Sequence, residues 1–304
     1  GQGCRPVAAG PPSVKIVLID FHTHTTASDG ALTPGEMVER ALAAGIRLLA
    51  LTDHDTVAGH RAAVAYYTQN PAPMRLVPGV ELSCRWSGTT VHILGLGIDC
   101  DHPTLVAGLA QLDHARLQRG ATIAGRLRAL GFPGALEGAV AEAGDSQLGR
   151  PHFAAWMVAQ GHVADLNQAF DRYLGQGKTG DVKAFWPEMA EVVQWIVAAG
   201  GVALIAHPLK YRFTRMKLRR LVVDFTAAGG TGIEIQSGRQ MPDQAAQLQR
   251  LARDFGLEVS AGSDFHRDTP YGPSLGVELP LLQGLRGVWD RWAVPHRTDG
   301  SATP

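Results

Sequence analysis

The stretch 14–30 reads VKIVLIDFHTHTTASDG and joins an apolar run to residue types that bind metals. Its first six residues are mostly apolar and rich in β-branched types, which is typical of a buried strand. His22 and His24 follow, and side chains two positions apart on an extended chain point to the same side. Asp29 comes next in a Ser-Asp-Gly turn, where we expect Gly30 to let the backbone fold back. The stretch therefore predicts a strand with a polar site at its carboxyl end.

Six further short apolar runs follow along the chain, and helical patterns separate most of them. One pattern, TPGEMVERALAAG (33–45), begins with threonine before proline, and another, WPEMAEVVQWIVAAGG (186–201), ends at glycines. This alternation predicts an α/β fold with a largely parallel sheet, either open or closed into a barrel. The runs are RLLAL (47–51), GVELS (79–83), VHILGLGI (91–98), GVALIA (201–206), GIEIQ (232–236) and LEVSAG (257–262).

The rhythm changes between residues 99 and 190, where leucine and isoleucine recur at helical spacing and no clear strand is evident. We therefore expect a helical insertion into the α/β body. The recurring residues are Leu105, Leu109, Leu112, Ile123, Leu127 and Leu130.

Length and composition permit a substantial core, because the chain has 304 residues of which 45% are apolar. Its 28 lysines and arginines balance its 28 aspartates and glutamates, so the formal net charge is zero. A neutral chain has no global basic field that attracts nucleic acid or anionic membranes. We therefore expect a local cluster of basic residues to hold any anionic ligand.

Three cysteines, Cys4, Cys84 and Cys100, lack the short spacings of zinc knuckles or disulfide frameworks, which favours a reducing, cytoplasmic setting. No apolar run approaches the length of about 20 residues that spans a membrane, and no feature indicates an obligate protein partner. We expect residues 1–15 to form a flexible leader and residues 291–304 a frayed tail.

Polar residues of metal-binding types fall at or near the ends of the expected strands. The carboxyl ends of parallel strands meet at one face, where active sites of α/β barrels and sheets lie. Imidazoles and carboxylates without thiolates suit Mn, Zn or Fe, and their number exceeds the needs of one ion. We therefore expect two or three divalent ions. Besides Asp29, the residues are His22, His24, His54, Glu81, His92, His207, Asp264 and His266.

Each of these groups has a structural alternative when it is considered alone. The motif TDHD (52–55) could be a helix cap, since threonine and aspartate favour that position, and SDFH (263–266) could be a turn. A single histidine at a strand end, such as His92, is more often a hydrogen-bonded structural residue than a ligand. Their joint occurrence on successive strand ends favours a metal site.

Six motifs in this order resemble the PHP (polymerase and histidinol phosphatase) superfamily of metal-dependent phosphoesterases: FHTHTTASDG, LTDHDT, GVELS, VHILGLGID, IAHPLKY and GSDFH. The likeness runs from about residue 16 to 290. It includes PGALEGA, GRPHF and YLGQGKTG, which separate the branch of 3′,5′-nucleoside bisphosphate phosphatases and 5′-to-3′ exoribonucleases from histidinol phosphatases. The resemblance implies a distorted (β/α)7 TIM-like barrel from residues 16–98 and 191–290. It also implies that the helical insertion, 99–190, binds the substrate phosphate.

The resemblance also implies which side chains hold metals. His22, His24, Glu81 and Asp264 look like the ligands of one ion, with Glu81 as the candidate bridge. Mn²⁺ is the expected metal, with Zn²⁺ or Fe²⁺ as alternatives. Asp264 or His207 could shuttle a proton, and the sequence does not decide between them. Further ions would be held by Asp29, His54 and His266, with His92 and His207 completing the cluster or contacting substrate phosphate.

Basic residues of the insertion are candidates for binding phosphate. Arg116 and Arg119 are three apart on an expected helix and share a face, so they can fork around a terminal phosphate. A solvated helix face is the alternative. By resemblance they bind the 5′-phosphate of the substrate, and Arg150, His152 and Lys178 are similar candidates.

The motif HPLKY (207–211) departs from the family, whose members usually read His-Pro-Gly-Arg-Tyr. Lys210 keeps the positive charge of that arginine but loses its bidentate fork. We expect Lys210 to lie near the site. Several aromatic residues could stack on a base, although most are expected in the core. They are Phe153, Trp156, Phe185, Trp186 and Tyr211.

The activity that the resemblance implies is hydrolysis of a phosphate ester on the 3′ side of a 5′-phosphorylated nucleotide. The expected substrates are 3′,5′-bisphosphonucleotides such as pAp and short 5′-phosphorylated RNA. Two alternatives stay open: a phosphatase of histidinol phosphate or another small phosphate ester, and a regulatory module with a vestigial metal cluster. No glycine-rich phosphate loop or nucleophile elbow supports a kinase or a serine hydrolase.

Overall fold

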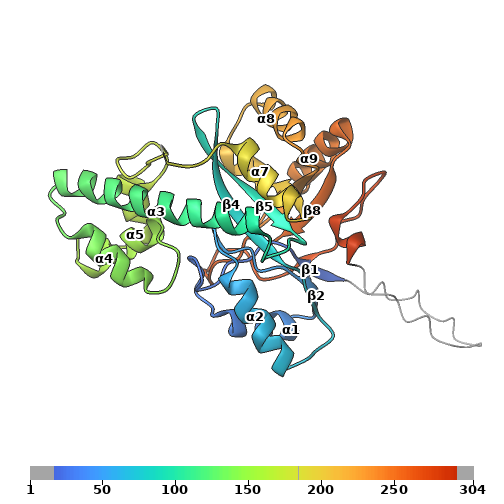
Figure 1. Cartoon of the computed structure of the whole chain (residues 1–304), viewed down its shortest axis with the longest axis horizontal. Coiled ribbons are helices and arrows are strands. Elements are labelled where there is room, and N and C mark those ends of the chain that lie inside the picture. Colours follow the sequence, from blue (N-terminus) through green and yellow to red (C-terminus); the bar gives the residue numbers. More distant parts are fainter. Residues whose placement is uncertain (1–16, 184, 293–304) are drawn as a thin grey trace, which may run out of the picture.

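The computed structural model describes residues 17–183 and 185–292. Two hydrogen-bonded sheets, ordered β3-β2-β1-β9 and β4-β5-β6-β7-β8, curve around one core (Figure 1). Isolated parallel bridges join the sheets, between His54 and Glu81 on one side and between Thr23 and Phe265 on the other. The ring formed by β1, β2 and β4 to β8 is the distorted α/β barrel that the sequence predicts. The strands are β1 (Leu18–Asp20), β2 (Ile46–Leu49), β3 (Arg75–Leu76), β4 (Gly79–Trp86), β5 (Thr89–Leu96), β6 (Val202–Ile205), β7 (Gly232–Ser237), β8 (Glu258–Gly262) and β9 (Val277–Glu278).

The seven predicted runs all contain strands of this ring, and the pairing is largely parallel as predicted, with β5 as the exception. This strand is antiparallel to both β4 and β6. Only Ser87 and Gly88 separate β4 from β5, and both residues have positive φ, at 46° and 71°. A two-residue turn of this kind builds a hairpin, because a parallel connection needs a dozen or more residues.

Helices cover the outside of the barrel, so its strands are buried runs rather than alternating patterns. All residues of β6 and β8 are buried. The first helix has the predicted start, because Thr33 and Glu36 form a capping box around Pro34. The barrel helices are α1 (Pro34–Ala43), α2 (Ala58–Gln69), α7 (Met189–Ala198), α8 (Arg215–Ala227) and α9 (Pro242–Phe255).

The segment 103–174, called the insertion below, is helical and forms the lobe on the left of Figure 1. Its first helix serves both parts of the molecule, because Leu105 and Leu112 pack in the barrel core whereas Ile123 and Leu127 pack in a separate core. Leu130, in contrast, is 48% exposed, since the helix ends one residue before it. The elements are α3 (Pro103–Ala129), α4 (Ala135–Ala143), α5 (Arg150–Ala159), α6 (Leu166–Ala169) and the π-turn η1 (Phe170–Leu174).

Two boundaries differ from the sequence-based division. Helix α7 starts inside the expected insertion but packs on β4, β5 and β6. At the other end, Arg291 of η3 (Val288–Arg291) pairs with Glu258, and the ring of Trp292 lies 5.7 Å from that of Phe21. These contacts attach two residues of the expected tail to the barrel. The expected leader and the remaining tail lie outside the described residues. Among the described helices, none is both long enough and apolar enough to cross a membrane.

Candidate metal centre and substrate cleft

His22 and His24 lie just beyond β1 on backbone that the barrel holds extended. Thr23, between them, donates from its hydroxyl to the carbonyl of Ala50 at 2.9 Å, and its backbone bridges Phe265. Both imidazole rings are fully buried, with centroids 5.2 Å apart. The backbone contacts of Thr23 therefore turn both histidines to the same, inward side, as their spacing predicts.

Glu81, in the middle of β4, is the centre of the site. Its carboxylate oxygens lie within 3.3 Å of nitrogens from five histidines, which come from four different segments of the barrel. No other described carboxylate contacts so many imidazoles. The distances are 3.0 Å to His22 Nε2, 3.1 Å to His24 Nε2, 3.3 Å to His54 Nδ1, 3.0 Å to His92 Nδ1 and 2.8 Å to His207 Nε2.

Asp264, just after β8, faces the same two histidines as Glu81. Its Oδ1 lies 3.4 Å from His22 Nε2 and 3.3 Å from His24 Nε2. Its φ of +53° is uncommon for a residue with a side chain, and its N–H donates to the carbonyl of His22 at 2.8 Å. The structure thus brings together His22, His24, Glu81 and Asp264, with one donor atom of each lying within 4.8 Å of the others.

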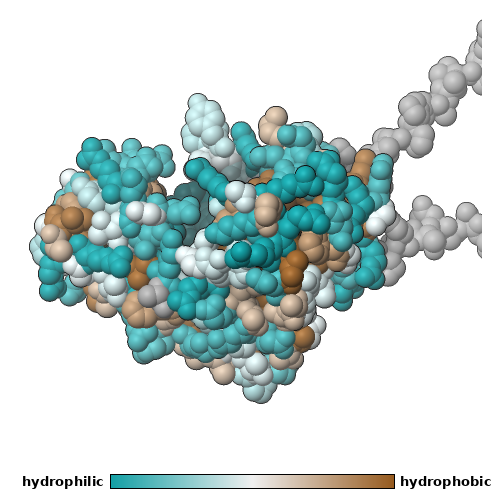
Figure 2. Space-filling model, turned by 90° about the horizontal axis from the view of Figure 1, so that it is seen from above, coloured by the Kyte–Doolittle hydropathy of each residue, from teal (hydrophilic) through white to brown (hydrophobic). Residues whose placement is uncertain are grey.

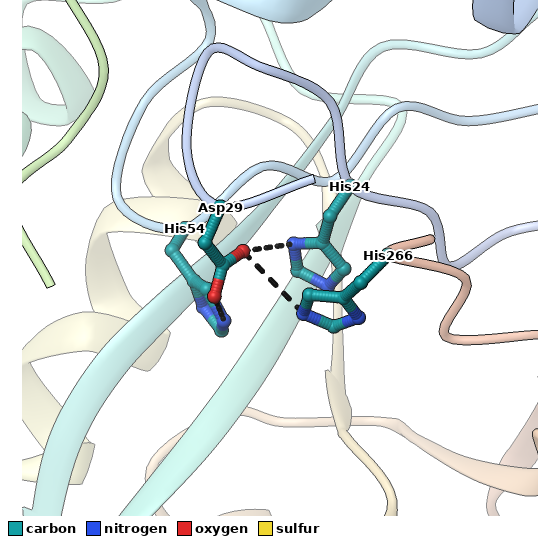
Figure 3. A group of neighbouring side chains, drawn as sticks. All are labelled: His24, Asp29, His54 and His266. Atoms are coloured by element: carbon teal, nitrogen blue, oxygen red, sulfur yellow. Dashed lines mark ion pairs between the residues drawn. The ribbon is translucent and has the colours of Figure 1, made fainter. Parts of the chain in front are cut away.

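A second group consists of His24, Asp29, His54 and His266 (Figure 3). Asp29 Oδ1 lies 3.8 Å from His24 Nδ1 and 3.4 Å from His266 Nε2, while its Oδ2 lies 3.8 Å from His54 Nε2. His24 therefore faces both groups, which the sequence did not predict. The turn that carries Asp29 requires glycine at position 30, because a Cβ there would lie 2.1 Å from the carbonyl oxygen of His24.

A third group, formed by His54, Glu81 and His92, overlaps the other two. The three groups share members, so ions held in them would be close neighbours. His207 contacts Glu81 but belongs to none of the three groups. Within the described residues, this arrangement supports a cluster of ions rather than one isolated ion.

Unpartnered nitrogen atoms test whether the cluster fits metals. Among the described residues, the buried Nδ1 and Nε2 of His24, Nδ1 of His54 and Nδ1 of His207 make no hydrogen bond, although Glu81 lies 3.1 Å from His24 Nε2 and 3.3 Å from His54 Nδ1. A buried polar atom without a partner is unfavourable, and such atoms are rare in native proteins. Divalent metal ions would use these lone pairs, so the donor set fits the metals expected from the sequence.

The electrostatics of the centre favour a cation. Burial alone would raise the pKa of Glu81, but the positive charge of His22, His54 and His92 holds it well below the usual range. Burial alone would lower the pKa of His24, yet Asp264 and Glu81 raise it to about 10. The carboxylates therefore need positive charge beside them. Protons on the histidines supply it when no metal is bound, so protons and metal ions compete for the imidazole nitrogens.

Two carboxylates that sequence reasoning missed hold the centre in place. Glu234 of β7 accepts from His22 Nδ1 at 2.9 Å and from the N–H of His207 at 2.6 Å. Such a partner fixes the orientation of a ligand histidine. Asp53 binds the loop that carries Asp29, by accepting from Thr25 and Ser28 at 2.7 to 2.8 Å. The sequence signal for Glu234 was a glutamate inside the apolar run GIEIQ.

The helix-cap alternative for TDHD is wrong, because α2 begins at Ala58 and its cap, Val57, has no side-chain bond. Asp55 instead accepts from the N–H of Ser83 at 2.6 Å and from Nε of Arg116 at 2.7 Å. It thereby links the barrel to α3 of the insertion through a buried ion pair.

A cleft of about 630 Å³ separates the metal cluster from the insertion. Figure 2 shows it as the recess between the left lobe and the barrel. Its barrel side includes Asp29, His54, His92 and His266, and its opposite side is basic. The basic side contains four of the predicted substrate contacts, Arg116, Arg119, Arg150 and His152.

The other two predicted basic contacts do not line this cleft. Lys178 is exposed on the loop after η1, and Lys210 bonds to Asp264 at the rim of the metal cluster. Of the five aromatic residues, Trp186 lines the cleft, whereas Phe153 and Trp156 are in the core of the insertion. Tyr211 accepts from the N–H of His92 at 2.8 Å.

Arg116 and Arg119 are each only 7% exposed, so the solvated-face alternative is wrong. Their guanidinium groups lie 5.3 and 5.1 Å from the ring of Trp186, which fixes their positions. Burial and the charge of Arg150 lower the pKa of Arg119 to about 9. A buried guanidinium group close to another positive charge is unfavourable. An anionic ligand would compensate that charge, so the arginines favour binding of an anion.

We predict that His22→Ala and Asp29→Ala lose different metal ions. His22 contacts Glu81 and Asp264, whereas Asp29 contacts only the second group of imidazoles. Each variant should therefore retain metal in the group that it leaves intact. Metal analysis by mass spectrometry of Mn²⁺-loaded protein checks this, and paramagnetic resonance of the retained Mn²⁺ should differ between the variants. Identical metal content and spectra would contradict two separate groups.

Comparison with known proteins agrees with this geometry. A PHP domain model matches residues 20–114. The chain is 44% identical over 275 residues to a 5′-3′ exoribonuclease of Haemophilus influenzae, covering 90% of this chain and 98% of that protein. It is 42% identical over 272 residues to the 3′,5′-nucleoside bisphosphate phosphatase of Chromobacterium violaceum, covering 89% and 95%. A solved structure from C. violaceum, described as an amidohydrolase with bound sulfate and no metal, superposes with a TM-score of 0.81 at 40% identity, covering 90% and 95%.

Proposed function

Because this chain belongs to the family of PHP-domain 5′-3′ exoribonucleases and 3′,5′-nucleoside bisphosphate phosphatases, we propose that it is a metal-dependent hydrolase of 5′-phosphorylated nucleotides. It removes the phosphate on the 3′ side of 3′,5′-bisphosphonucleotides such as pAp, and it trims short 5′-phosphorylated RNA from its 5′ end. One observation supports this assignment above the others: a single cleft has the metal cluster on one side and three arginines on the other. A substrate with two phosphate groups fits that division.

The residues of the cluster have separate tasks in this proposal. His22, His24, Glu81 and Asp264 would hold one ion, and Asp29, His54 and His266 would hold a second together with His24. His92, with Glu81 and His54, would complete a third site. Bound divalent ions would supply Lewis-acid activation of water and of the phosphoryl group. Nitrogen and oxygen donors without sulfur favour Mn²⁺, with Zn²⁺ or Fe²⁺ as alternatives.

The arginines bind and orient the substrate. Arg119 and Arg150 present guanidinium groups to the cleft, and Arg116 adds positive charge while its Nε stays paired with Asp55. A 5′-phosphate held there fixes the position of the nucleotide, so the ester on its 3′ side points towards the metal cluster. His152 lines the same side of the cleft. Burial lowers the pKa of its imidazole, which favours the neutral form, so it adds no positive charge there.

Proton transfer falls to one of two groups at the cluster, Asp264 or His207. Both oxygens of Asp264 are engaged, Oδ1 with His22 and His24 and Oδ2 with Lys210. His207 bonds to Glu81 through Nε2 and keeps Nδ1 without a partner among the described residues. We therefore assign proton transfer to His207 and a metal-ligand role to Asp264.

Cys84 and Cys100 are free thiols, which fits the cytoplasm as the proposed location.

A panel of substrates tests the proposed function against its two alternatives. Phosphate release with Mn²⁺ is compared among pAp, histidinol phosphate and oligonucleotides with either a 5′-phosphate or a 5′-hydroxyl. We expect pAp and the 5′-phosphorylated oligonucleotide to be preferred by about 10²-fold, which corresponds to one or two charge-assisted contacts. A preference for histidinol phosphate would support the small-molecule phosphatase. Absence of activity on every substrate, despite bound metal, would support the vestigial module.

A further inference from the structure

We propose that the groove between α8 and α9 is a second anion site, which binds the sugar-phosphate backbone of RNA on the 3′ side of the scissile ester. The proposal rests on the proposed exoribonuclease function. It adds that RNA, unlike pAp, would also be bound along the outside of the barrel. The groove has a volume of about 490 Å³. It is called the α8–α9 groove below, and its charged residues are Arg215, Arg219, Arg250, Arg253 and Asp254.

The α8–α9 groove has uncompensated positive charge. Its one carboxylate, Asp254, accepts from Arg219 at 2.6 Å. Arg253 donates to the carbonyl of Gln283 at 3.1 Å, which leaves its charge in place. Arg215 and Arg250 are exposed and have neither a hydrogen bond nor an ion pair within the described residues. Four guanidinium groups against one carboxylate, in a chain of zero net charge, favour a polyanion.

Rigidity distinguishes this groove from a loose patch of surface arginines. Its walls are helices α8 and α9, which the ion pair of Arg219 and Asp254 connects, and the buried Leu218 and Leu251 line it. The guanidinium of Arg219 lies 4.9 Å from the ring of Phe255, so Arg219 is held by a stacking contact as well as an ion pair. Two of the four guanidinium groups, those of Arg219 and Arg253, are therefore held in place before an anion binds.

A basic segment leads from the metal cluster to the α8–α9 groove. The stretch KYRFTRMKLRR (210–220) contains six lysines and arginines and no acidic residue. It starts at Lys210, which bonds to Asp264 of the cluster, and its arginines at 215 and 219 line the groove. Five residues span at most about 18 Å even when fully extended, so the groove begins close to the catalytic centre. At about 3.4 Å per phosphate along a helical strand, this upper limit corresponds to no more than about five phosphates.

The position of Lys210 gives the direction of the strand. The 5′ nucleotide of the substrate is assigned to the cleft beside the insertion, and Lys210 does not line that cleft. The rest of an RNA chain has to leave the metal cluster elsewhere, and the basic segment provides a path along α8. Figure 2 views the molecule from the side of α8 and shows strongly hydrophilic side chains gathered over this part of the barrel.

A double charge reversal, Arg215→Glu with Arg250→Glu, tests the proposal in the full-length metal-loaded enzyme. Both residues are exposed, so the fold should be retained, and activity on pAp reports on it directly. The matched control is Arg47→Glu with Arg128→Glu, which reverses two exposed arginines on β2 and α3. The measurements are kcat/KM for pAp, kcat/KM for a 5′-phosphorylated RNA of about 12 nucleotides, and anisotropy of a labelled 5′-hydroxyl RNA of the same length in chelator.

We expect the reversal to weaken RNA binding roughly tenfold at low salt and to reduce the slope of log Kd against log salt by about 1.4, or 0.7 for each lost phosphate contact. The kcat/KM for the RNA should fall by a similar factor, while that for pAp stays constant. Unchanged RNA affinity would overturn the proposal, and so would an equal loss on pAp or an equal effect of the control variant. If the wild type hydrolysed neither substrate, the proposed function would fail, yet the anisotropy would still decide on the groove.

Discussion

Glu81→Gln is expected to lower kcat/KM for pAp by at least about 10³-fold and to remove more than one metal ion per chain. The carboxylate of Glu81 lies within 3.3 Å of nitrogens from five histidines, and it belongs to two of the three metal-binding groups. Glutamine has nearly the same shape but no charge, so the same imidazoles would face a weaker ligand. Loss of a group that only hydrogen-bonds to a metal ligand already lowers metal affinity by about 10- to 100-fold.

Steady-state kinetics and metal analysis of the purified variant check this expectation. The matched control is Glu278→Gln, which neutralises an exposed glutamate of β9, the strand that pairs with β1. Circular dichroism of both variants distinguishes a lost metal from a lost fold. A variant that kept its full metal content and most of its activity would refute the central position of Glu81.

The second large effect is expected from Arg119→Ala, which should lower kcat/KM for pAp by about 10²-fold and leave 3′-AMP nearly unchanged. A charge-assisted contact to phosphate contributes about 1.5 to 3 kcal/mol, and only pAp offers the 5′-phosphate. Arg119 is the better choice than Arg116, because removal of Arg116 would leave Asp55 as an unpaired buried carboxylate. Loss of that ion pair would destabilise the fold and confuse the result.

Two further variants make the test of Arg119 specific. Arg119→Lys keeps the charge without the fork and should restore part of the preference for pAp. Arg126→Ala removes an exposed arginine two turns further along α3, whose only described bond is to the carbonyl of Thr179, and should behave as wild type. Equal losses on pAp and 3′-AMP would show that Arg119 does not bind the 5′-phosphate.

The sequence predicted the strands of the barrel well because each is a short, buried, apolar run. It also indicated His22 and His24 as a pair, since their spacing on an extended chain fixes their common direction. The direction of β5 was missed, although the two residues between GVELSCRW and TTVHILGL demand a hairpin. Pairing direction follows from loop length, which the apolar pattern alone does not include.

Contacts between distant segments could not be predicted in the same way. His24 faces two groups because the barrel closes between Thr23 and Phe265, which are far apart in sequence. Glu234 and Asp55 acquire their roles from partners on other elements, His22 and Arg116, that no local pattern specifies. Lys178 had the residue type of a phosphate contact but lies on an exposed loop outside the cleft. Residue type predicts the chemistry of a site, whereas tertiary contacts decide which residues belong to it.

The most direct test of the account is the identity of the products from pAp. The metal cluster and the arginines are assigned to opposite ends of one substrate, so only the ester on the 3′ side should be cleaved. Analysis by chromatography and mass spectrometry is expected to find 5′-AMP and inorganic phosphate, with the reaction abolished by chelator and restored by Mn²⁺. Formation of 3′-AMP, or an undiminished rate in chelator, would contradict the account.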